Sequence, residues 1–271
     1  MYCSIFLWYT INSYKIVEGD NVKALITGAS SGIGKDFAKL LINKYDELIL
    51  VARNDERLKK LKTELNQIPD KRIKIIAMDL SNPKNCEKLF NENKDVDMLI
   101  NNAGFGDCGY FHKTDLEKDI SMINTNITAV HVLSKLYLKE MVKNNKGHIL
   151  NVASIAAFIP GPLMTTYYST KSYVLKLSES IRGELKTLNT NVKISVLCPG
   201  PVKTNFEKTA NVQFQISKAS SFKVANYALK HINRFYICPG FSAKFVRIIS
   251  KILPNTLLSK MAYKSQRRRI K

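Results

Sequence analysis

The chain has 271 residues, of which 45% are hydrophobic and 24% are charged, so it can bury the core of one large α/β domain. Its formal net charge is +20, and the excess lies near the end, because residues 208–271 hold 14 Lys and Arg but no Asp or Glu. Charge alone does not establish nucleic-acid binding, no recognition motif accompanies it, and no run reaches the roughly 18 apolar residues that span a bilayer.

The first 21 residues precede the first predicted strand. The segment from Met1 to Ile11 is apolar and aromatic, but it lacks the basic start and the small-residue cleavage site of a signal peptide. One hypothesis is that native translation begins after this extension, since Val22 can open the first strand directly. The intact mass of the natively expressed protein would test it.

From residue 22 onward, short apolar runs alternate with amphipathic segments. Strands are predicted at 22–27, 48–52, 73–78, 96–100, 147–152, 192–197 and 235–237. Helices are predicted at 33–43, 55–66, 85–92, 117–142, 165–188 and 227–232. This alternation favours an α/β fold in which helices cover both faces of a parallel sheet. We interpret 22–207 as a dinucleotide-binding and catalytic core, and 208–271 as a substrate lid, a last helix and strand, and a basic tail.

A glycine-rich turn joins the first strand to the first helix. Its glycines have the spacing G-x-x-x-G-x-G from Gly28 to Gly34, which allows close approach of a phosphate to the backbone. The helix N-terminus that follows would supply free N–H groups to a pyrophosphate. The candidate binding residues are Gly28, Ser30, Ser31, Gly32, Ile33 and Gly34. The alternative is a glycine-rich turn without a ligand.

The helix predicted at 165–188 carries a tyrosine and a lysine one turn apart. Positions i and i+4 share one face, so the Tyr167 hydroxyl and the Lys171 ammonium can face the same pocket. Of the 12 tyrosines, Tyr167 alone has lysine at i+4. A nearby cation lowers a phenol pKa, which would make Tyr167 an acid or base near neutral pH. Tyr168 is expected to be a packing neighbour.

These motifs resemble those of the short-chain dehydrogenase/reductase family, over about residues 22–207. The ordered set comprises the glycine turn at Thr27–Gly34, Asp79-Leu80, N-N-A-G at Asn101–Gly104, Asn126, Ser154, Tyr167-x-x-x-Lys171, and Pro199-Gly200 with Val202 and Thr204. The resemblance implies a doubly wound Rossmann-type parallel sheet of about seven strands with helices on both faces.

The resemblance also implies a catalytic set of four residues. Tyr167 would exchange a proton with the substrate oxygen, and Lys171 would lower the tyrosine pKa and bind the nicotinamide ribose. Ser154 would orient and polarise the substrate oxygen, and Asn126 would hold a water linking Lys171 to bulk solvent. Taken singly, Ser154 could be an ordinary loop serine and Asn126 a packing amide.

By the same resemblance, further positions would bind the cofactor. Asp79 and Leu80 would line the adenine pocket, and Asn102, Ala103 and Gly104 would pass beneath the adenosine ribose. Pro199, Gly200, Val202 and Thr204 would hold the carboxamide end. No metal is expected, since the five cysteines are scattered and form no Cys/His cluster.

Arg53 predicts which nicotinamide cofactor is used. NAD enzymes of this type place a carboxylate at the end of the second strand to bind the ribose 2′-hydroxyl, but the sequence there is Val51-Ala52-Arg53-Asn54. A guanidinium suits a 2′-phosphate, so NADP(H) is predicted. The alternatives are that Asp55 or Glu56 binds the ribose, or that Arg53 caps the sheet edge.

The substrate end is predicted from apolar residues outside the motifs. The segment 203–221 would close over the substrate, lined by Phe206, Phe214 and Ile216. Cys108, Phe111 and His112 could reach the same cleft, although His112 is better explained as a surface loop histidine. An apolar lining favours a hydrophobic carbonyl compound or alcohol.

The function predicted is therefore an NADP(H)-dependent oxidoreductase that reduces a carbonyl or oxidises an alcohol. A cofactor-binding regulatory protein on the same fold is the alternative, although the presence of both Tyr167 and Lys171 argues against it. Resemblance alone implies a homodimer or tetramer that pairs through the helices at 117–142 and 165–188. Scattered cysteines fit a reducing, cytoplasmic compartment, and no nucleic-acid partner is expected.

The C-terminal tail combines apolar and basic residues at helical spacing. Phe241, Phe245, Ile248, Ile249 and Ile252 recur on one face, and Leu257, Leu258 and Met261 continue after Pro254. Lys244, Arg247, Lys251 and Arg267-Arg268-Arg269 supply the charge. A basic amphipathic helix suggests peripheral contact with an anionic membrane. The alternative is packing of the apolar face on the sheet or on a partner subunit.

Overall fold

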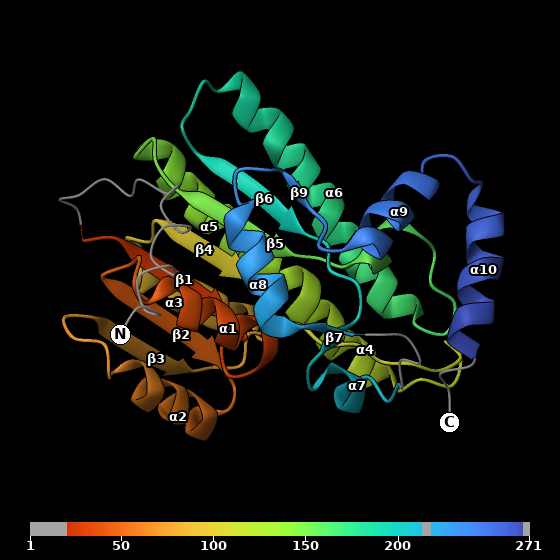
Figure 1. The fold of residues 1–271 in the computed structure, drawn as a ribbon, viewed down its shortest axis with the longest axis horizontal. Helices are drawn as coiled ribbons and strands as arrows, with labels where there is room; N and C mark the ends of the chain where they lie inside the picture. Colours follow the sequence, from red (N-terminus) through yellow and green to blue (C-terminus); the bar gives the residue numbers. More distant parts are fainter. Residues whose placement is uncertain (1–20, 213–217, 268–271) are drawn as a thin grey trace, which may run out of the picture.

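Seven short strands of buried aliphatic residues form a parallel sheet at the centre of the computed structural model, which describes residues 21–212 and 218–267 (Figure 1). The strand order is β3-β2-β1-β4-β5-β6-β9, and every neighbouring pair is parallel. The strands are β1 (Lys23–Thr27), β2 (Glu47–Ala52), β3 (Arg72–Ala77), β4 (Met98–Asn101), β5 (His148–Val152), β6 (Lys193–Leu197) and β9 (Tyr236–Ile237). The predicted doubly wound Rossmann-type fold of about seven strands is confirmed.

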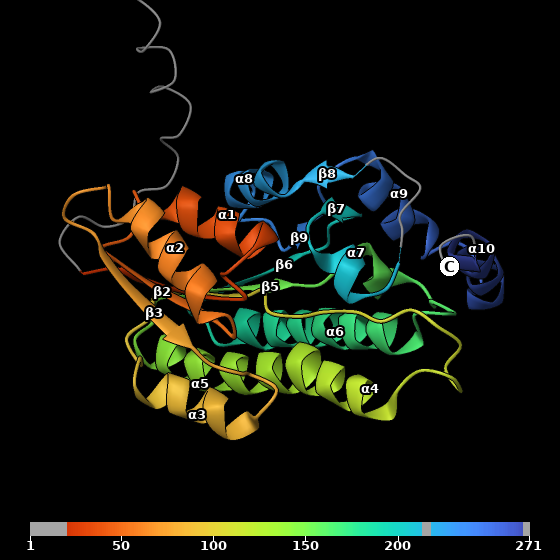
Figure 2. The same ribbon diagram turned by 90° about the horizontal axis from the view of Figure 1, so that it is seen from below.

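Helices cover both faces of this sheet (Figure 2). One face carries α1 (Gly32–Leu41), α2 (Asp55–Leu65) and α8 (Ser221–Lys230). The other carries α3 (Pro83–Asn91), α4 (Leu116–Ile123), α5 (Ala129–Lys143) and α6 (Thr165–Thr187). Beyond the carboxyl ends of the strands lie the short helices η2 (Ile155–Phe158) and α7 (Phe206–Thr209), the small sheet of β7 (Val202–Lys203) and β8 (Ala219–Ser220), and the C-terminal helices α9 (Phe241–Ile249) and α10 (Asn255–Arg267).

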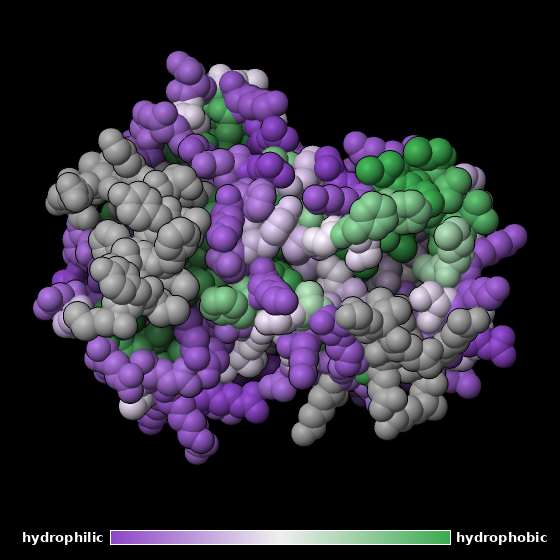
Figure 3. Space-filling view, in the orientation of Figure 1, coloured by the Kyte–Doolittle hydropathy of each residue, from purple (hydrophilic) through white to green (hydrophobic). Residues whose placement is uncertain are grey.

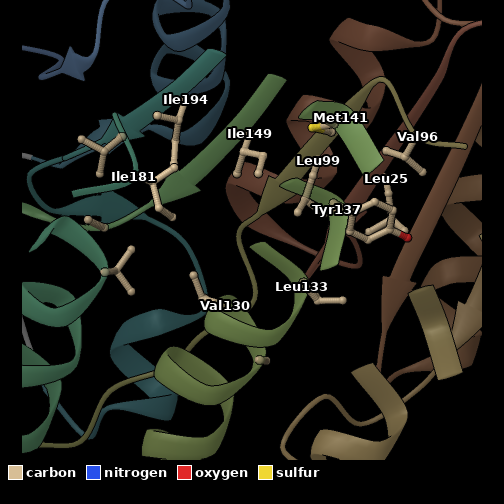
Figure 4. Packing of buried hydrophobic residues seen from close by; sticks show 14 of the residues in the cluster. Leu25, Val96, Leu99, Val130, Leu133, Tyr137, Met141, Ile149, Ile181 and Ile194 are labelled. Atoms are coloured by element: carbon tan, nitrogen blue, oxygen red, sulfur yellow. The ribbon is translucent and has the colours of Figure 1, made fainter. Parts of the chain in front are cut away.

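The alternation of side chains along each strand divides the core into two clusters. Leu25 points to the cluster shared with α3, α5 and α6, whereas Ile26 points to the cluster under α1, α2 and α8. In the first cluster, Tyr137 is fully buried among Leu99, Val96 and their neighbours (Figure 4). Its hydroxyl donates a 2.8 Å hydrogen bond to the carbonyl of Asn93, so the one polar atom of this ring is satisfied.

The strand order reverses between β1 and β4. In open α/β sheets, a crevice that binds ligands forms at such a point, outside the carboxyl ends of the strands. The glycine turn follows β1 and the N-N-A-G segment follows β4, so the fold brings these two distant motifs together at the crevice.

Two helices differ from the sequence-based prediction. The single helix predicted at 117–142 contains a π-helical turn, Asn124–Thr128, between α4 and α5. This wider turn positions the buried Asn126, whose side chain bonds to residues outside the helix. The helix predicted at 227–232 begins earlier, at Ser221, because Val224 and Ala225 add another buried turn against the sheet.

Some sequence-based predictions fall outside the described residues. They are the late start of native translation after residue 21, the lid positions Phe214 and Ile216, and the basic residues Arg268 and Arg269.

Candidate active site

The glycine turn fits closely against the segment that follows β4. Gly28 has a positive φ of 65°, and a Cβ there would lie 2.9 Å from the Ala103 Cα and from the Asn102 Nδ2. A Cβ on Gly34 would collide with the Gly28 carbonyl oxygen and the Asn102 amide. Both positions therefore require glycine, and they leave a backbone cradle in which a phosphate can approach the chain.

The N-terminus of α1 leaves its backbone donors available to a ligand. Ser31 is the N-cap residue, but its side chain makes no capping hydrogen bond. The first turn of the helix contains no acidic residue. Free N–H groups at the positive end of the helix dipole suit a pyrophosphate, so these residues fit the phosphates of a dinucleotide.

Asn102 ties β4 to the glycine turn. Its Nδ2 donates to the carbonyls of Thr27 at 3.0 Å and Gly28 at 3.2 Å. The backbone N–H groups of Asn102 and Ala103 both donate to the Thr27 hydroxyl, at 2.9 and 3.0 Å. These bonds hold the two halves of the crevice in register, so Asn102 organises the cradle.

Two arginines line the end of the cavity next to β2. Arg53 follows the strand and is exposed, and Arg57 lies in the first turn of α2, where its N–H donates to the Asn54 side chain at 2.8 Å. Arg53 is predicted from the sequence, whereas Arg57 is not; the only sequence signal for Arg57 is that it is a second arginine, four residues after Arg53. Asp79 and Leu80 line the cavity nearby.

Tyr167 and Lys171 face the cavity from the start of α6, as their i, i+4 spacing predicted. The Lys171 Nζ donates a 2.9 Å hydrogen bond to the carbonyl of Val152 and lies 5.9 Å from the centre of the Tyr167 ring. Only 5% of Lys171 is exposed. The end of β5 therefore anchors the lysine beside the tyrosine.

The pKa values of this pair are set mainly by burial. Burial raises the pKa of Tyr167 above its ordinary value, and a hydrogen bond with Ser154 acts in the opposite direction. This net direction is opposite to the lowering predicted from Lys171, because burial is the larger effect. Burial lowers the pKa of Lys171 to about 8. At neutral pH Tyr167 thus keeps its proton, as a proton donor requires.

Ser154 is held at the start of η2. Its hydroxyl accepts a 3.2 Å hydrogen bond from the N–H of Ala156 and is 3.5 Å from the carbonyl of Pro199. The same carbonyl accepts a 3.0 Å bond from the N–H of Ile155. Ser154 therefore lies on a fixed backbone beside the Tyr167 phenol.

Asn126 connects α6 with the segment after β4. Its Nδ2 donates to the Phe105 carbonyl at 2.9 Å and to the Thr170 hydroxyl at 3.0 Å, and its Oδ1 accepts from the Phe105 N–H at 3.1 Å. Asn126 is fully buried and does not line the cavity. Its side chain is thus engaged in positioning its neighbours, and the water-holding role stays a prediction.

These residues surround one cavity of about 880 Å³. The predicted residues that line it are Gly28, Ser30, Ser31, Gly32, Ile33, Arg53, Asp79, Leu80, Asn102, Ala103, Gly104, Ser154, Tyr167, Lys171, Pro199, Gly200, Val202 and Thr204. Gly34 and Asn126 lie behind its wall. The structure therefore brings together almost the whole predicted set.

The other end of the cavity is mostly apolar. Phe206 lines it, with its ring centre 5.1 Å from that of Tyr167. The opposite wall comes from the C-terminal helices, through the apolar residues Phe245, Val246, Ile249, Leu258, Met261 and Ala262 and the polar residues Ser242, Ser265 and Gln266. The apolar pattern of this tail is evident in the sequence, but its place in the wall of the site is not predicted from it.

The prediction that the loop after β4 reaches this end is wrong for Cys108 and Phe111, whereas His112 is exposed, as its explanation as a surface loop histidine predicts. Cys108, Phe111 and His112 do not line the cavity. Cys108 packs against the outside of the wall in a small cluster with Met164 and Phe206. Phe111 and His112 are exposed, because the loop turns outward before α4.

The family model for short chain dehydrogenases matches residues 22–214. An uncharacterized oxidoreductase of Staphylococcus saprophyticus is 33% identical over 192 residues, which are 68% of this chain and 77% of that protein. Human 17-beta-hydroxysteroid dehydrogenase type 3 is 32% identical over 203 residues, 73% of this chain and 65% of that protein.

Solved structures share the fold over most of the chain. A short-chain dehydrogenase from Sphingobium yanoikuyae in complex with NADPH has a TM-score of 0.77 and 26% identity, covering 85% of this chain and 93% of its own. A short-chain dehydrogenase/reductase from Burkholderia phymatum in complex with NAD has a TM-score of 0.76 and 24% identity, covering 84% and 92%.

Proposed function

The chain belongs to the short-chain dehydrogenase/reductase family, and on that premise we propose that it reduces the carbonyl group of a hydrophobic small molecule, or oxidises the corresponding alcohol, using NADP(H). The observation that carries this proposal is the convergence of Tyr167, Lys171 and Ser154 in one cavity, between a phosphate cradle and an apolar chamber.

In the direction of reduction, the substrate carbonyl would lie between Tyr167 and Ser154. A bound reduced nicotinamide would supply the hydride. Tyr167 donates its phenolic proton to the carbonyl oxygen, and the Ser154 hydroxyl holds that oxygen and stabilises the charge that develops on it. Tyr167 is protonated at neutral pH, which is the form that can donate a proton.

Lys171 would act beside the tyrosine rather than on the substrate. With a pKa near 8 it is mainly protonated at neutral pH, so it can hydrogen-bond the nicotinamide ribose and stabilise the tyrosinate that remains after proton transfer. Asn126 would assist by holding the Phe105 segment and α6 together, and by resemblance would hold the water that returns a proton.

NADP(H) is proposed over NAD(H) because cationic groups line the ribose end of the cavity. Arg53 and Arg57 both border it, and two guanidinium groups suit a 2′-phosphate. The similar structure from Sphingobium yanoikuyae is complexed with NADPH, whereas the one from Burkholderia phymatum is complexed with NAD. A direct comparison of the two cofactors is therefore needed.

The apolar end supports a hydrophobic substrate. Phe206 and six residues of α9 and α10 give this end a mostly apolar lining, to which Ser242, Ser265 and the Gln266 amide add a few polar groups that could orient a substrate. The relative named 17-beta-hydroxysteroid dehydrogenase type 3 is consistent with this class. We also propose that the chain forms a dimer or tetramer through the α4–α5 and α6 helices, where Leu116, Ile120 and Tyr173 are exposed.

We place the enzyme in the cytoplasm, with peripheral contact to anionic membranes through its C-terminal helices. Among the described residues, Cys86, Cys198 and Cys238 form no disulfide, which suits a reducing compartment. Within the described part of the chain, no helix is both long and apolar enough to span a bilayer. Any contact of these residues with a membrane would therefore be at its surface.

A ketone screen that follows NADPH absorbance tests the proposed activity. We expect NADPH oxidation that depends on both the protein and an added hydrophobic ketone or aldehyde, with slower oxidation of NADH. Tight NADPH binding without turnover of any carbonyl compound would instead support the regulatory alternative.

A further inference from the structure

The outer surface of α9, α10 and the turn between them exposes a set of large apolar side chains. We call this set the C-terminal face: Phe241, Phe245, Ile248, Ile252, Leu257 and Met261, which are 43–84% exposed. Phe241 and Phe245 stack with their ring centres 6.2 Å apart. Green surface gathers over these helices in the space-filling view (Figure 3). Exposed apolar clusters of this kind mark contact surfaces.

The charged side chains of the helices that form the C-terminal face are all basic. Lys244, Lys251, Lys260, Lys264 and Arg267 are exposed on the same two helices and the turn between them. No Asp or Glu follows Glu207 in the sequence, so these helices and the turn carry no carboxylate that could neutralise the cations. An apolar face whose own helices carry only basic charges suits the surface of an anionic bilayer.

A second copy of the chain fits this face less well. In a twofold pairing through the same patch, the cations of one copy would lie opposite those of the other. Like charges brought together in an interface are unfavourable, whereas anionic headgroups would neutralise them. The charge therefore favours a lipid surface as the occupant.

The same helices also form a wall of the active-site cavity. Phe245 and Met261 belong to both surfaces, since they line the cavity and are half exposed. The inward sides of α9 and α10 contribute Ile249 and Leu258. The apolar lining of the cavity is thus continuous, through Phe245 and Met261, with the exposed C-terminal face.

We propose that the C-terminal face rests on an anionic membrane leaflet and that the substrate passes from the bilayer into the cavity beside Phe245 and Met261. The docking part of this proposal depends only on the exposed apolar and basic residues of the C-terminal helices. The passage of substrate depends also on the proposed carbonyl reduction. The substrate class is then a ketone or alcohol dissolved in lipid, which reaches Tyr167 without crossing water.

Vesicle binding by the full-length chain tests the docking. We expect co-sedimentation with phosphatidylcholine vesicles that contain phosphatidylserine, weaker binding as salt increases, and little binding to pure phosphatidylcholine. The triple variant Phe241→Ser, Ile248→Ser, Ile252→Ser should lose at least about 30-fold in vesicle affinity. The matched control Leu188→Ser, Phe222→Ser removes exposed apolar residues elsewhere and should bind as the wild type does.

The cations are tested separately. Lys244→Gln and Lys251→Gln should each weaken vesicle binding by roughly fivefold, while Lys60→Gln and Lys84→Gln, exposed on other helices, should have little effect. Failure of the folded wild-type protein to bind anionic vesicles at low salt overturns the proposal. So does a change from dimer to monomer in the apolar triple variant during sedimentation, because the face would then be an interface between copies.

Substrate passage is tested with two ketones, one that partitions into vesicles and one short ketone that stays in water. The apolar triple variant, whose substituted residues do not line the cavity, should turn over the short ketone as the wild type does and lose most of the rate on the vesicle-bound ketone. Equal rates on the vesicle-bound ketone would overturn the passage. Vesicle binding without turnover of either ketone would leave docking intact and reject the proposed reaction.

Discussion

The carboxyl edge of the sheet and the C-terminal helices both line the cavity, but they differ in whether their buried polar side chains have hydrogen-bond partners. Behind the edge, Asn101, Asn151, Ser134 and Ser178 are buried in one hydrogen-bonded network, in which only the Asn101 Oδ1 lacks a partner. On α10, both ends of the Gln266 amide are buried without a partner. The same helices expose apolar side chains to the outside.

This difference indicates two kinds of structural role. All but one of the buried polar groups in the network at the catalytic edge have partners, which holds reacting side chains in position before any ligand arrives. The C-terminal helices have buried polar groups and exposed apolar groups that the described chain does not satisfy. We therefore expect substitutions at the edge to affect chemistry and stability, and substitutions in the C-terminal helices to affect access and binding.

The largest expected effect is at the catalytic edge. Tyr167→Phe removes the proton donor and keeps the ring, so the fold and NADPH binding should persist while turnover falls by about 10²–10⁴. Steady-state rates and a cofactor titration measure the two effects. Turnover close to that of the wild type would show that Tyr167 is not the proton donor. It would also contradict the expectation that substitutions at the carboxyl edge affect the chemistry.

Substitutions of one buried amide in each region, Asn151 and Gln266, compare how much each amide contributes to the free energy of unfolding. Asn151→Leu removes bonds to Asn101 and Ser178 and should cost about 2–4 kcal/mol of unfolding free energy, because it leaves buried polar groups without partners. Gln266→Leu removes an amide without partners and should leave stability unchanged or raise it by up to about 1 kcal/mol. Urea unfolding measures both. Equal losses would show that Gln266 is as well satisfied as Asn151.

Acid should destabilise the sheet through His148. Burial, with a smaller effect from Lys193, lowers the pKa of His148 to about 4, and its Nε2 lies 2.9 Å from the Ser195 hydroxyl. That hydroxyl donates to the Ile232 carbonyl, so it accepts from His148. Between pH 6.5 and 4 the unfolded chain binds the extra proton. His148 therefore contributes stability that is present above pH 6.5 and lost as the pH falls toward 4.

The loss attributable to His148 should be about 3 kcal/mol, since each pKa unit corresponds to about 1.4 kcal/mol. Unfolding free energies at several pH values, compared with those of His148→Gln, isolate this contribution. A variant that follows the wild type at every pH would show that His148 does not titrate as described.

Arg53→Ala should weaken NADPH binding by about 1.5–3 kcal/mol, the usual range for a hydrogen bond to a charged group. NADH binding should change little. Lys60→Ala on α2, outside the cavity, is the control. Isothermal titration with both cofactors measures the effect, and equal losses for both would mean that Arg53 is structural.

Much of the edge could be predicted from the sequence because local rules determine it. Gly28 needs a positive φ, and Tyr167 and Lys171 share a helix face at i and i+4. The tail could not be placed in this way. Leu258 and Ile249 face the cavity, whereas Ile248 and Leu257 face outward. Apolar periodicity predicts that a helix has an apolar face, but it does not predict which surface that face contacts. The π turn at Asn126 was also missed, since its stabilising bonds reach residues 21 and 44 positions away.

Transfer of deuterium tests the central claim most directly. The protein is incubated with NADPH that carries deuterium at its transferable carbon and with hydrophobic ketones, and the alcohol product is analysed by mass spectrometry. The account predicts an alcohol with one deuterium on the former carbonyl carbon, formed by the wild type and nearly absent with Tyr167→Phe. If the wild type forms no deuterated alcohol from any ketone, or if Tyr167→Phe forms it at the wild-type rate, the proposed mechanism is contradicted.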